Sequence, residues 1–334
     1  MQTKNDLIIV GAGPSGLAAA IAAAKGGLSY AVLEKGVLVN SIFHFPRNMT
    51  FFTTPELLEI GGIPFTTPYE KPTRWEGLRY YRRVADAYEI PIAFGEEVLS
   101  IGPVKDGDAS SGFEVVTRAD GERRRIRRAW SVIIATGYYD HPNRLGVPGE
   151  NLPHVRHYYT EPHEYYRKKV VVVGGKNSAA ITALELYRSG AAVTLIHRGA
   201  RLSDSIKYWI LPDIENRIRE GSIRALFNTV VVRIGRALVT SSRNGYIEKI
   251  PADAVLLLTG YHPDTDLMAR AGVQIDPVTL VPRHDRETME TNVPGLYAAG
   301  SVVSGKDTNR IFIENGRFHG ERIVRHILSR PNRG

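Results

Sequence analysis

Two short apolar runs, residues 7–10 and 170–173, each end at a glycine-rich turn. After the first turn, small apolar residues fill positions 18–24, and another apolar run covers 28–33. Apolar runs bounded by glycine are typical of buried strands, and a small-residue run after such a turn favours a helix packed closely on a sheet. The pattern predicts a strand, a tight turn, a helix and a second strand.

The first turn contains Gly11, Gly13 and Gly16, the spacing of a dinucleotide-binding motif. There the glycines let the backbone approach a pyrophosphate, which the following helix attracts with the unpaired N–H groups of its first turn. Glu34 ends the next predicted strand, where a carboxylate accepts hydrogen bonds from ribose hydroxyls. We expect a nucleotide without a 2′-phosphate here, such as FAD or NAD.

The second turn repeats this register with the opposite charge. In the first copy, Glu34 comes 23 residues after the first glycine. The same spacing from Gly174 in the second copy leads to His197, which is followed by Arg198 and, close behind, Arg201. Guanidinium groups bind a 2′-phosphate through charge-assisted hydrogen bonds, whereas a carboxylate would repel it. We therefore expect NADPH. Lys176 replaces the second glycine, and its ammonium group either neutralises the pyrophosphate, marks a different nucleotide position, or is simply solvated.

A second repeat is nested in the first, because the run 132–138 is echoed by 255–261, each with Thr-Gly-Tyr after four apolar residues. Each predicts a buried strand that turns at glycine below a dinucleotide, and polar proline turns at 140–143 and 262–264 are candidate interdomain connections.

The predicted fold class is α/β, with two Rossmann-like, three-layer dinucleotide domains, the second inserted in the first. The FAD-binding domain would be residues 1–141 and 265–334, and the NADPH-binding domain residues 142–264.

Other segments are expected to complete the flavin site. A helix is predicted over 73–87 and a strand over 94–101, in which the Val98 backbone is a candidate adenine contact. Residues 43–54, with Asn48, lie where a flavin ring could be held, although a packed loop fits equally well. An apolar strand ends at Gly300, and residues 311–316 are expected to open the last helix, whose N-terminal dipole would stabilise a reduced ring.

Composition narrows the chemistry. The 334 residues suit two domains, and the absence of cysteine excludes a thiolate nucleophile, an internal disulfide relay and iron–sulfur ligation. The net charge of +8 favours anionic ligands or an acidic partner, and the basic run 123–128 is either a solvated hairpin arm or a docking patch. Without a recognition motif, a long apolar stretch or a leader, we expect a cytoplasmic protein with neither nucleic acid nor membrane as partner.

Together these motifs resemble the bacillithiol disulfide reductase (bacilliredoxin reductase) family, within the low-molecular-weight flavoproteins of the thioredoxin reductase class. The resemblance covers essentially the full length and rests on the phrases at 51–61, 135–140, 146–150, 174–178, 259–264 and 313–320. It implies FAD in the first domain, NADPH in the second, hydride transfer through the flavin, and a homodimer or higher homo-oligomer. A lysine at position 176 is expected in this family.

Two positions depart from the resemblance. Thioredoxin reductases hold a C-x-x-C pair just before the second dinucleotide motif, where this chain has the segment 157–160, His-Tyr-Tyr-Thr. Bacillithiol disulfide reductases place a cysteine in the first glycine motif, where this chain has Ser15. A serine hydroxyl is too weakly acidic to replace a thiolate in disulfide exchange, although it can bind a phosphate. The resemblance therefore carries over the cofactors more securely than the disulfide substrate.

The leading interpretation is an NADPH-dependent FAD oxidoreductase that passes electrons to a separate acceptor, which could be a small disulfide, a redoxin, a ferredoxin or a flavodoxin. A ferredoxin- or flavodoxin-NADP reductase, a flavin monooxygenase and a non-catalytic NADPH-sensing flavoprotein are alternatives. His157, Glu161 and His319 are candidate proton donors, but a structural role is favoured for each, and we assign neither a catalytic residue nor a metal site. The expected FAD-binding residues are Gly11, Gly13, Ser15, Gly16, Glu34, Lys35, Asn48, Val98, Thr136, Gly137, Gly300, Ser301 and Phe312, and the expected NADPH-binding residues are Gly174, Gly175, Lys176, Asn177, Ser178, His197, Arg198, Arg201 and Gly260.

Overall fold

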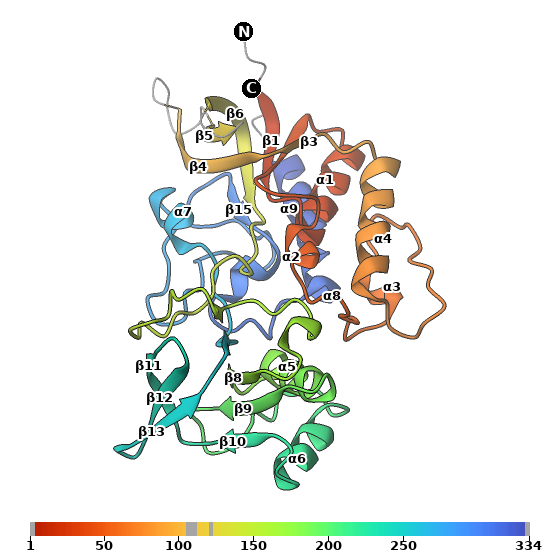
Figure 1. The fold of residues 1–334 in the computed structure, drawn as a ribbon. Coiled ribbons are helices and arrows are strands. Elements are labelled where there is room, and N and C mark those ends of the chain that lie inside the picture. The colour runs from red at the N-terminus through yellow and green to blue at the C-terminus, as the bar shows by residue number, and fades with distance from the viewer. Residues whose placement is uncertain (1–3, 105–111, 120–122, 331–334) are drawn as a thin grey trace. The chain divides into compact units, whose positions relative to one another are not determined.

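The chain divides into two units in the computed structural model, which describes residues 4–104, 112–119 and 123–330 (Figure 1). Unit 1 comprises Met1–His141 and Tyr261–Gly334, and unit 2 comprises Pro142–Gly260. The second unit is thus inserted in the first. By this division the chain returns to unit 1 at Tyr261, whereas the sequence pattern suggested residue 265.

Unit 1 is built on a sheet with strand order β3-β2-β1-β6-β5-β4, in which β15 also pairs with β6. A parallel part combines β1 (Asn5–Val10), β2 (Tyr30–Glu34), β3 (Ile92–Phe94), β15 (Leu296–Ala298) and the end of β6 (Arg123–Ile134). The start of β6 forms an antiparallel part with β5 (Phe113–Ala119) and β4 (Glu96–Pro103). Parallel strands covered on both faces have continuous apolar runs, which is why 7–9 and 132–134 are fully buried.

Helices flank this sheet, with α9 (His319–Ser329) beside α1 (Pro14–Lys25) (Figure 1). The two helices approach so closely that a Cβ on Gly320 would lie 2.4 Å from the Cα of Ala19. Helix α4 (Arg74–Ala87) begins with a capping box formed by Thr73 and Glu76, a stabilising arrangement at helix starts. The shorter helices are α2 (Asn40–Phe43), α3 (Pro55–Leu58), α7 (Thr265–Arg270), the 3-10 turn η3 (Gly300–Ser304) and α8 (Ile313–Gly316).

Two predicted elements of unit 1 are divided in the structure. The strand expected over 94–101 is interrupted at Gly95, which separates β3 from β4 with a positive φ of 66°. The helix expected to open at 311–316 is two helices, α8 and α9, with residues 317 and 318 between them. The Phe318 N–H lies 3.4 Å from the Asn315 carbonyl oxygen, and the Arg322 N–H is equally far from the Phe318 carbonyl oxygen.

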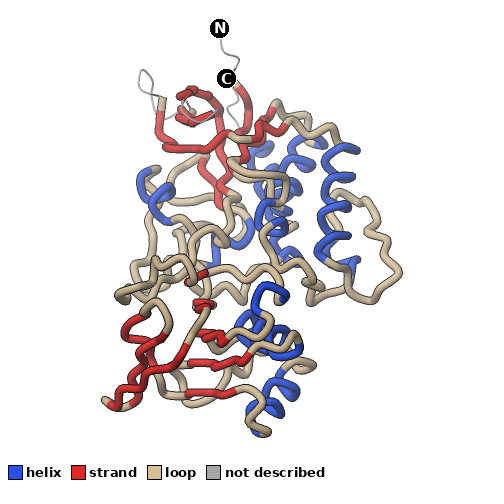
Figure 2. The backbone as a smooth tube through the Cα atoms, in the orientation of Figure 1, coloured by secondary structure: helices blue, strands red, loops and turns tan. Residues whose placement is uncertain are grey.

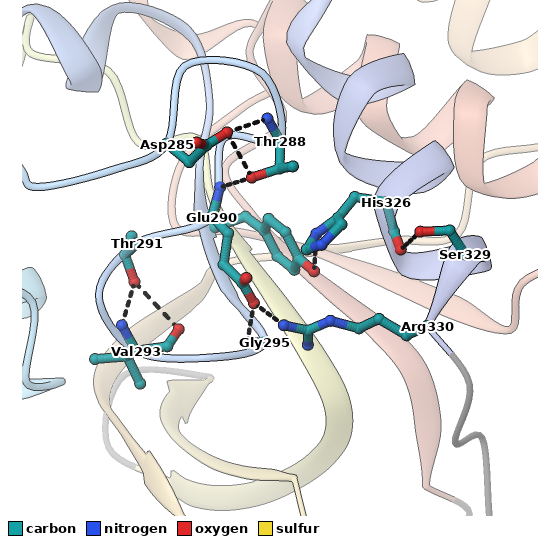
Figure 3. Close-up of polar contacts among 10 residues, drawn as sticks. Asp285, Thr288, Glu290, Thr291, Val293, Gly295, His326, Ser329 and Arg330 are labelled. Atoms are coloured by element: carbon teal, nitrogen blue, oxygen red, sulfur yellow. Dashed lines mark hydrogen bonds and ion pairs between the residues drawn. The ribbon is translucent and has the colours of Figure 1, made fainter.

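Polar contacts fix the end of α9 to the loop before β15 (Figure 3). The buried Tyr297 hydroxyl lies 3.1 Å from Nδ1 of His326. Arg330 pairs with Glu290, whose carboxylate also accepts the Gly295 N–H at 2.6 Å. The C-terminal helix is therefore held by packing on α1 and by this cluster.

Unit 2 contains a parallel sheet with strand order β10-β9-β8-β14-β7 and a separate antiparallel sheet β11-β12-β13. Figure 2 shows helices in blue and strands in red. The parallel strands are β7 (Val155–Arg156), β8 (Lys169–Val173), β9 (Ala192–Ile196), β10 (Arg224–Leu226) and β14 (Ala254–Leu257), with η2 (His163–Tyr165), α5 (Asn177–Arg188) and α6 (Leu211–Arg219) around them. The antiparallel strands are β11 (Val230–Ile234), β12 (Leu238–Arg243) and β13 (Tyr246–Pro251). The predicted α/β class is confirmed, since each unit has a parallel sheet with helices. No helix in the described ranges is long and apolar enough to cross a membrane.

Candidate functional site

The first glycine turn joins β1 to α1 and leaves room for no side chain at two of its glycines. A Cβ on Gly11, whose φ is +103°, would lie 2.6 Å from the Ala135 carbonyl oxygen. A Cβ on Gly16 would lie 1.9 Å from the Gly11 carbonyl oxygen. Gly13 differs, because apart from its own chain neighbours no described atom lies within 4 Å of the position its Cβ would take. The turn therefore packs backbone against backbone on one side and offers open space at Gly13, as a dinucleotide phosphate requires.

Glu34 ends β2 with a buried carboxylate, only 6% exposed, that ties down this turn. Its Oε2 accepts the Ala12 N–H at 2.8 Å, and its Oε1 accepts the Gly36 N–H at 2.7 Å. Burial raises the pKa of Glu34, while the two N–H donors act in the opposite direction. Because an ionised carboxylate has about four acceptor positions, two remain for ribose hydroxyls. Glu34 can hold the loop and a ribose together.

Two further turns of unit 1 meet beside this loop. Thr136 and Gly137 follow β6, and a Cβ on Gly137 would lie 3.6 Å from the Ser301 hydroxyl oxygen. The Thr136 hydroxyl is buried and finds no hydrogen-bond partner in the part of the chain that the structure describes. A buried hydroxyl without a partner is unfavourable, so this group fits a site where a ligand supplies the partner. The arrangement suits an extended dinucleotide such as FAD.

Ser15, at the position where the family resemblance places a cysteine, points its side chain at two glycines. Its hydroxyl oxygen would lie 2.5 Å from a Cβ on Gly300 and 3.1 Å from a Cβ on Gly316. Both glycines are therefore needed to accommodate the side chain at position 15. This contact brings the start of α1, η3 and α8 to one place.

The remaining expected FAD-binding residues lie at more varied positions. The Lys35 ammonium group pairs with Asp140 at 2.8 Å, which joins the end of β2 to the segment after β6. Asn48 is exposed in a turn closed by the bond from the Met49 N–H to the Pro46 carbonyl oxygen. Val98 is half-buried in β4, and Phe312, 44% exposed, directly precedes α8.

The second glycine turn, in unit 2, packs differently from the first. A Cβ on Gly174 would lie 2.6 Å from the Leu258 carbonyl oxygen. A Cβ on Gly175 would lie 2.2 Å from Cε1 of His197, and one on Gly199 would lie 2.8 Å from its Nε2. The His197 ring is thus enclosed by two glycines, a packing role that the sequence pattern did not indicate.

Charge at this turn comes from arginine and lysine. Burial and the neighbouring charge of Arg198 lower the pKa of His197, so its imidazole is neutral near pH 7. Arg198 is exposed, and Arg201 pairs at 2.8 Å with Asp204, both side chains being largely in solvent. Lys176 is also exposed, directly before α5. These cations are available to the phosphates of a nucleotide.

A strap formed by residues 203–207 crosses the second turn. The Ser203 N–H donates to the Gly175 carbonyl oxygen at 2.9 Å. The Asn177 side chain accepts the Lys207 N–H at 2.9 Å and donates to the Ser205 carbonyl oxygen at 3.2 Å. Asn177 therefore fixes the strap, while Ser178 is exposed in the first turn of α5. Gly260 lies at the end of unit 2, where its carbonyl oxygen accepts the Asn143 N–H at 2.9 Å.

The candidate proton donors belong to different units of the chain. His157 and Glu161 belong to unit 2, and His157 lies 3.4 Å from the buried carboxylate of Glu150. His319 belongs to unit 1, where its Nδ1 accepts the Gly300 N–H at 3.0 Å. Within the described ranges, no cluster of three or more histidine, aspartate or glutamate side chains could hold a metal ion.

Comparison with known proteins finds similarity over most of the chain. A family model described as pyridine nucleotide-disulphide oxidoreductase matches residues 8–300. The bacilliredoxin reductase of Bacillus subtilis (strain 168) is 45% identical over 326 residues, 97% of this chain and 98% of the relative. The bacillithiol disulfide reductase of Bacillus cereus superposes with a TM-score of 0.95 at 43% identity, covering 98% of this chain and 99% of the other. A ferredoxin–NADP reductase of Ignicoccus hospitalis is 27% identical over 338 residues, 96% of this chain and 98% of the relative.

Proposed function

The chain belongs to the bacillithiol disulfide reductase family of the pyridine nucleotide-disulphide oxidoreductases, and from this premise we propose that it passes electrons from NADPH, through FAD, to a separate acceptor. Membership confirms three predictions: the family itself, an FAD-dependent oxidoreductase, and FAD and NADPH as cofactors. The assignment of each cofactor to a unit is our proposal. Unit 1 would bind FAD and unit 2 would bind NADPH.

The observation that carries this assignment is the charge at equivalent positions of the two glycine turns. In unit 1 the buried Glu34 carboxylate suits a ribose with free hydroxyls, and the open space at Gly13 with the unpartnered Thr136 hydroxyl suits the rest of FAD. In unit 2 the exposed Arg198 and Arg201 suit a 2′-phosphate. A carboxylate would repel that phosphate.

The chemistry requires only that each unit bind and orient its cofactor. When bound, NADPH can donate a hydride to the flavin, which then supplies two electrons to an acceptor. The chain itself has no cysteine, so no disulfide relay runs through its side chains. Any disulfide that is reduced must belong to the acceptor, which we propose is a redoxin, because a small disulfide by itself would have to be reduced without a thiolate of the chain.

A second candidate acceptor is a ferredoxin or flavodoxin. The relative from Ignicoccus hospitalis carries the name ferredoxin–NADP reductase, and the net charge of +8 suits an acidic electron carrier. We also propose a cytoplasmic location and a homodimer or higher homo-oligomer. Light scattering during size-exclusion chromatography measures the oligomeric state directly.

One set of assays tests the proposed function. Acid release of the flavin followed by chromatography should yield one FAD per chain. Steady-state turnover with NADPH should proceed with ferricyanide, a quinone or an acidic carrier, and should be slow with bacillithiol disulfide alone. Finding FMN, no flavin, or no turnover with any acceptor would contradict the proposal.

A further inference from the structure

His319, the first residue of α9, is a buried histidine whose bonding determines its protonation state. It is 6% exposed, and its Nδ1 lies 3.0 Å from the Gly300 backbone nitrogen. A backbone N–H can only donate, so Nδ1 must accept and cannot carry a hydrogen. The imidazole is therefore neutral, with its hydrogen on Nε2.

The surroundings of His319 favour that neutral form. Burial lowers the pKa of His319 to about 4, and Coulombic repulsion from neighbouring groups, above all Arg322 on the same helix, acts in the same direction. At pH 7 nearly every molecule keeps the bond to Gly300. The site therefore disfavours the protonated form that His319 would need in order to act as a proton donor.

Gly300, the residue that His319 holds, has little freedom to lie elsewhere. Its φ of +74° is in the left-handed region, and a Cβ there would lie 2.5 Å from the Ser15 hydroxyl oxygen. Gly316 also packs against it, since a Cβ on Gly316 would lie 3.3 Å from the Gly300 Cα. Removing the imidazole would leave a buried backbone N–H without its acceptor at a closely packed turn.

The position of His319 is itself fixed by helix packing. Gly320, the next residue, sits directly on the backbone of α1, where a Cβ would lie 2.6 Å from the Ala19 nitrogen. The imidazole therefore extends from a helix whose backbone packs closely on that of α1. Through the bond from the Gly300 N–H to this imidazole, α9 holds the turn that follows β15.

We propose that His319 is a positioning residue of the FAD site, which fixes the turn Gly300–Ser301 through the Gly300 N–H and so sets the affinity for FAD. The inference rests on the proposed assignment of Gly300 and Ser301 to the flavin. It gives His319 a defined task in place of the proton donation that the sequence left open. The Ser15 side chain, in the first turn of α1, packs against the same Gly300.

Three substitutions separate positioning from general packing. In His319→Asn the amide oxygen can replace Nδ1 as acceptor, whereas His319→Gln carries its amide one carbon further out, and His319→Leu has no acceptor. The dissociation constant for FAD is measured by flavin fluorescence, together with the absorption spectrum of the bound flavin. We expect His319→Leu and His319→Gln to weaken FAD binding about 10- to 100-fold, the effect of one unsatisfied buried N–H, and His319→Asn to stay within about threefold of wild type.

A matched control exists on the same helix. His326 also uses its Nδ1 in a hydrogen bond, to the Tyr297 hydroxyl at 3.1 Å, but at the far end of α9 (Figure 3). His326→Leu should lower thermal stability and leave FAD affinity unchanged.

Each outcome decides the inference. Equal FAD affinity in His319→Asn and His319→Gln would overturn it, and this pair decides the question even if His319→Leu fails to fold. An effect of His326→Leu on FAD as large as that of His319→Leu would also overturn it, because a general loss of packing would then explain both. A wild-type protein that binds no FAD would instead contradict the proposed function itself.

Discussion

Replacing Glu34 by glutamine tests the FAD assignment with almost no change of shape. The carboxylate accepts two backbone N–H groups, from Ala12 at 2.8 Å and from Gly36 at 2.7 Å, and it is 6% exposed. A glutamine can accept only one of them, and its NH₂ group would face the other N–H, which costs stability. It also removes the negative charge that Glu34 offers to the ribose hydroxyls, and losing one charge-assisted bond to the ribose costs about 1.5–3 kcal/mol, so Glu34→Gln should raise the dissociation constant for FAD about 10- to 150-fold.

Unit 2 offers a control with nearly the same geometry. Glu150 is also 6% exposed, and it accepts the Leu145 N–H at 2.9 Å and the Gly146 N–H at 2.7 Å. Glu150→Gln should cost the protein similar stability but leave FAD affinity unchanged. Fluorescence titration of the apoprotein with FAD, beside thermal unfolding of each variant, measures both quantities. If Glu34→Gln and Glu150→Gln bind FAD equally well, Glu34 does not hold the nucleotide and the reasoning is refuted.

Three further predictions concern the coenzyme, the missing thiol and pH. Arg198→Ala should weaken NADPH binding by about 1.5–3 kcal/mol, toward the lower end because the side chain is exposed, and should have little effect on NADH. An equal increase in KM for both coenzymes would show that Arg198 does not bind the 2′-phosphate. Ser15→Cys should be accommodated between Gly300 and Gly316 and should speed reoxidation of the reduced flavin by bacillithiol disulfide, and fast reoxidation of the wild-type enzyme would show that the serine is no obstacle. The pKa of His319 is 6.5 in the unfolded chain and about 4 in the folded protein. As the pH falls, the unfolded chain therefore takes up this proton before the folded protein does. The free energy of unfolding should then drop by about 3 kcal/mol between pH 6.5 and 4. Urea unfolding at pH 7 and pH 5 checks this, and His319→Asn should reduce the dependence; identical pH profiles would contradict it.

The central strands and the glycine turns could be predicted from the sequence because their signals are local. A strand buried on both faces needs a continuous apolar run, and a turn that packs on backbone needs glycine, as at Gly11 and Gly16. The sheet β11-β12-β13 was not predicted, since burial in it does not follow hydrophobicity: Ser241 is buried, whereas Ile247 is 61% exposed. Asn244 and Gly245, both with positive φ, are the hairpin signal that could have indicated it.

Other parts of the candidate sites depend on residues that are far apart in the sequence. The His197 ring is enclosed by Gly175 and Gly199, and only one of these glycines is its near neighbour. The bond from the Gly300 N–H to His319 spans 19 positions and two different elements. No spacing rule indicates such contacts, because they depend on how helices and turns pack in three dimensions.

The most direct test of the account is anaerobic stopped-flow reduction of the flavin by NADPH. The account predicts that NADPH bleaches the bound FAD rapidly and that NADH does so much more slowly at equal concentration. It also predicts that ferricyanide reoxidises the reduced flavin at once, since no cysteine of the chain has to take part. A flavin that NADPH fails to reduce, or that NADH reduces equally well, would contradict the proposed electron path from unit 2 to unit 1.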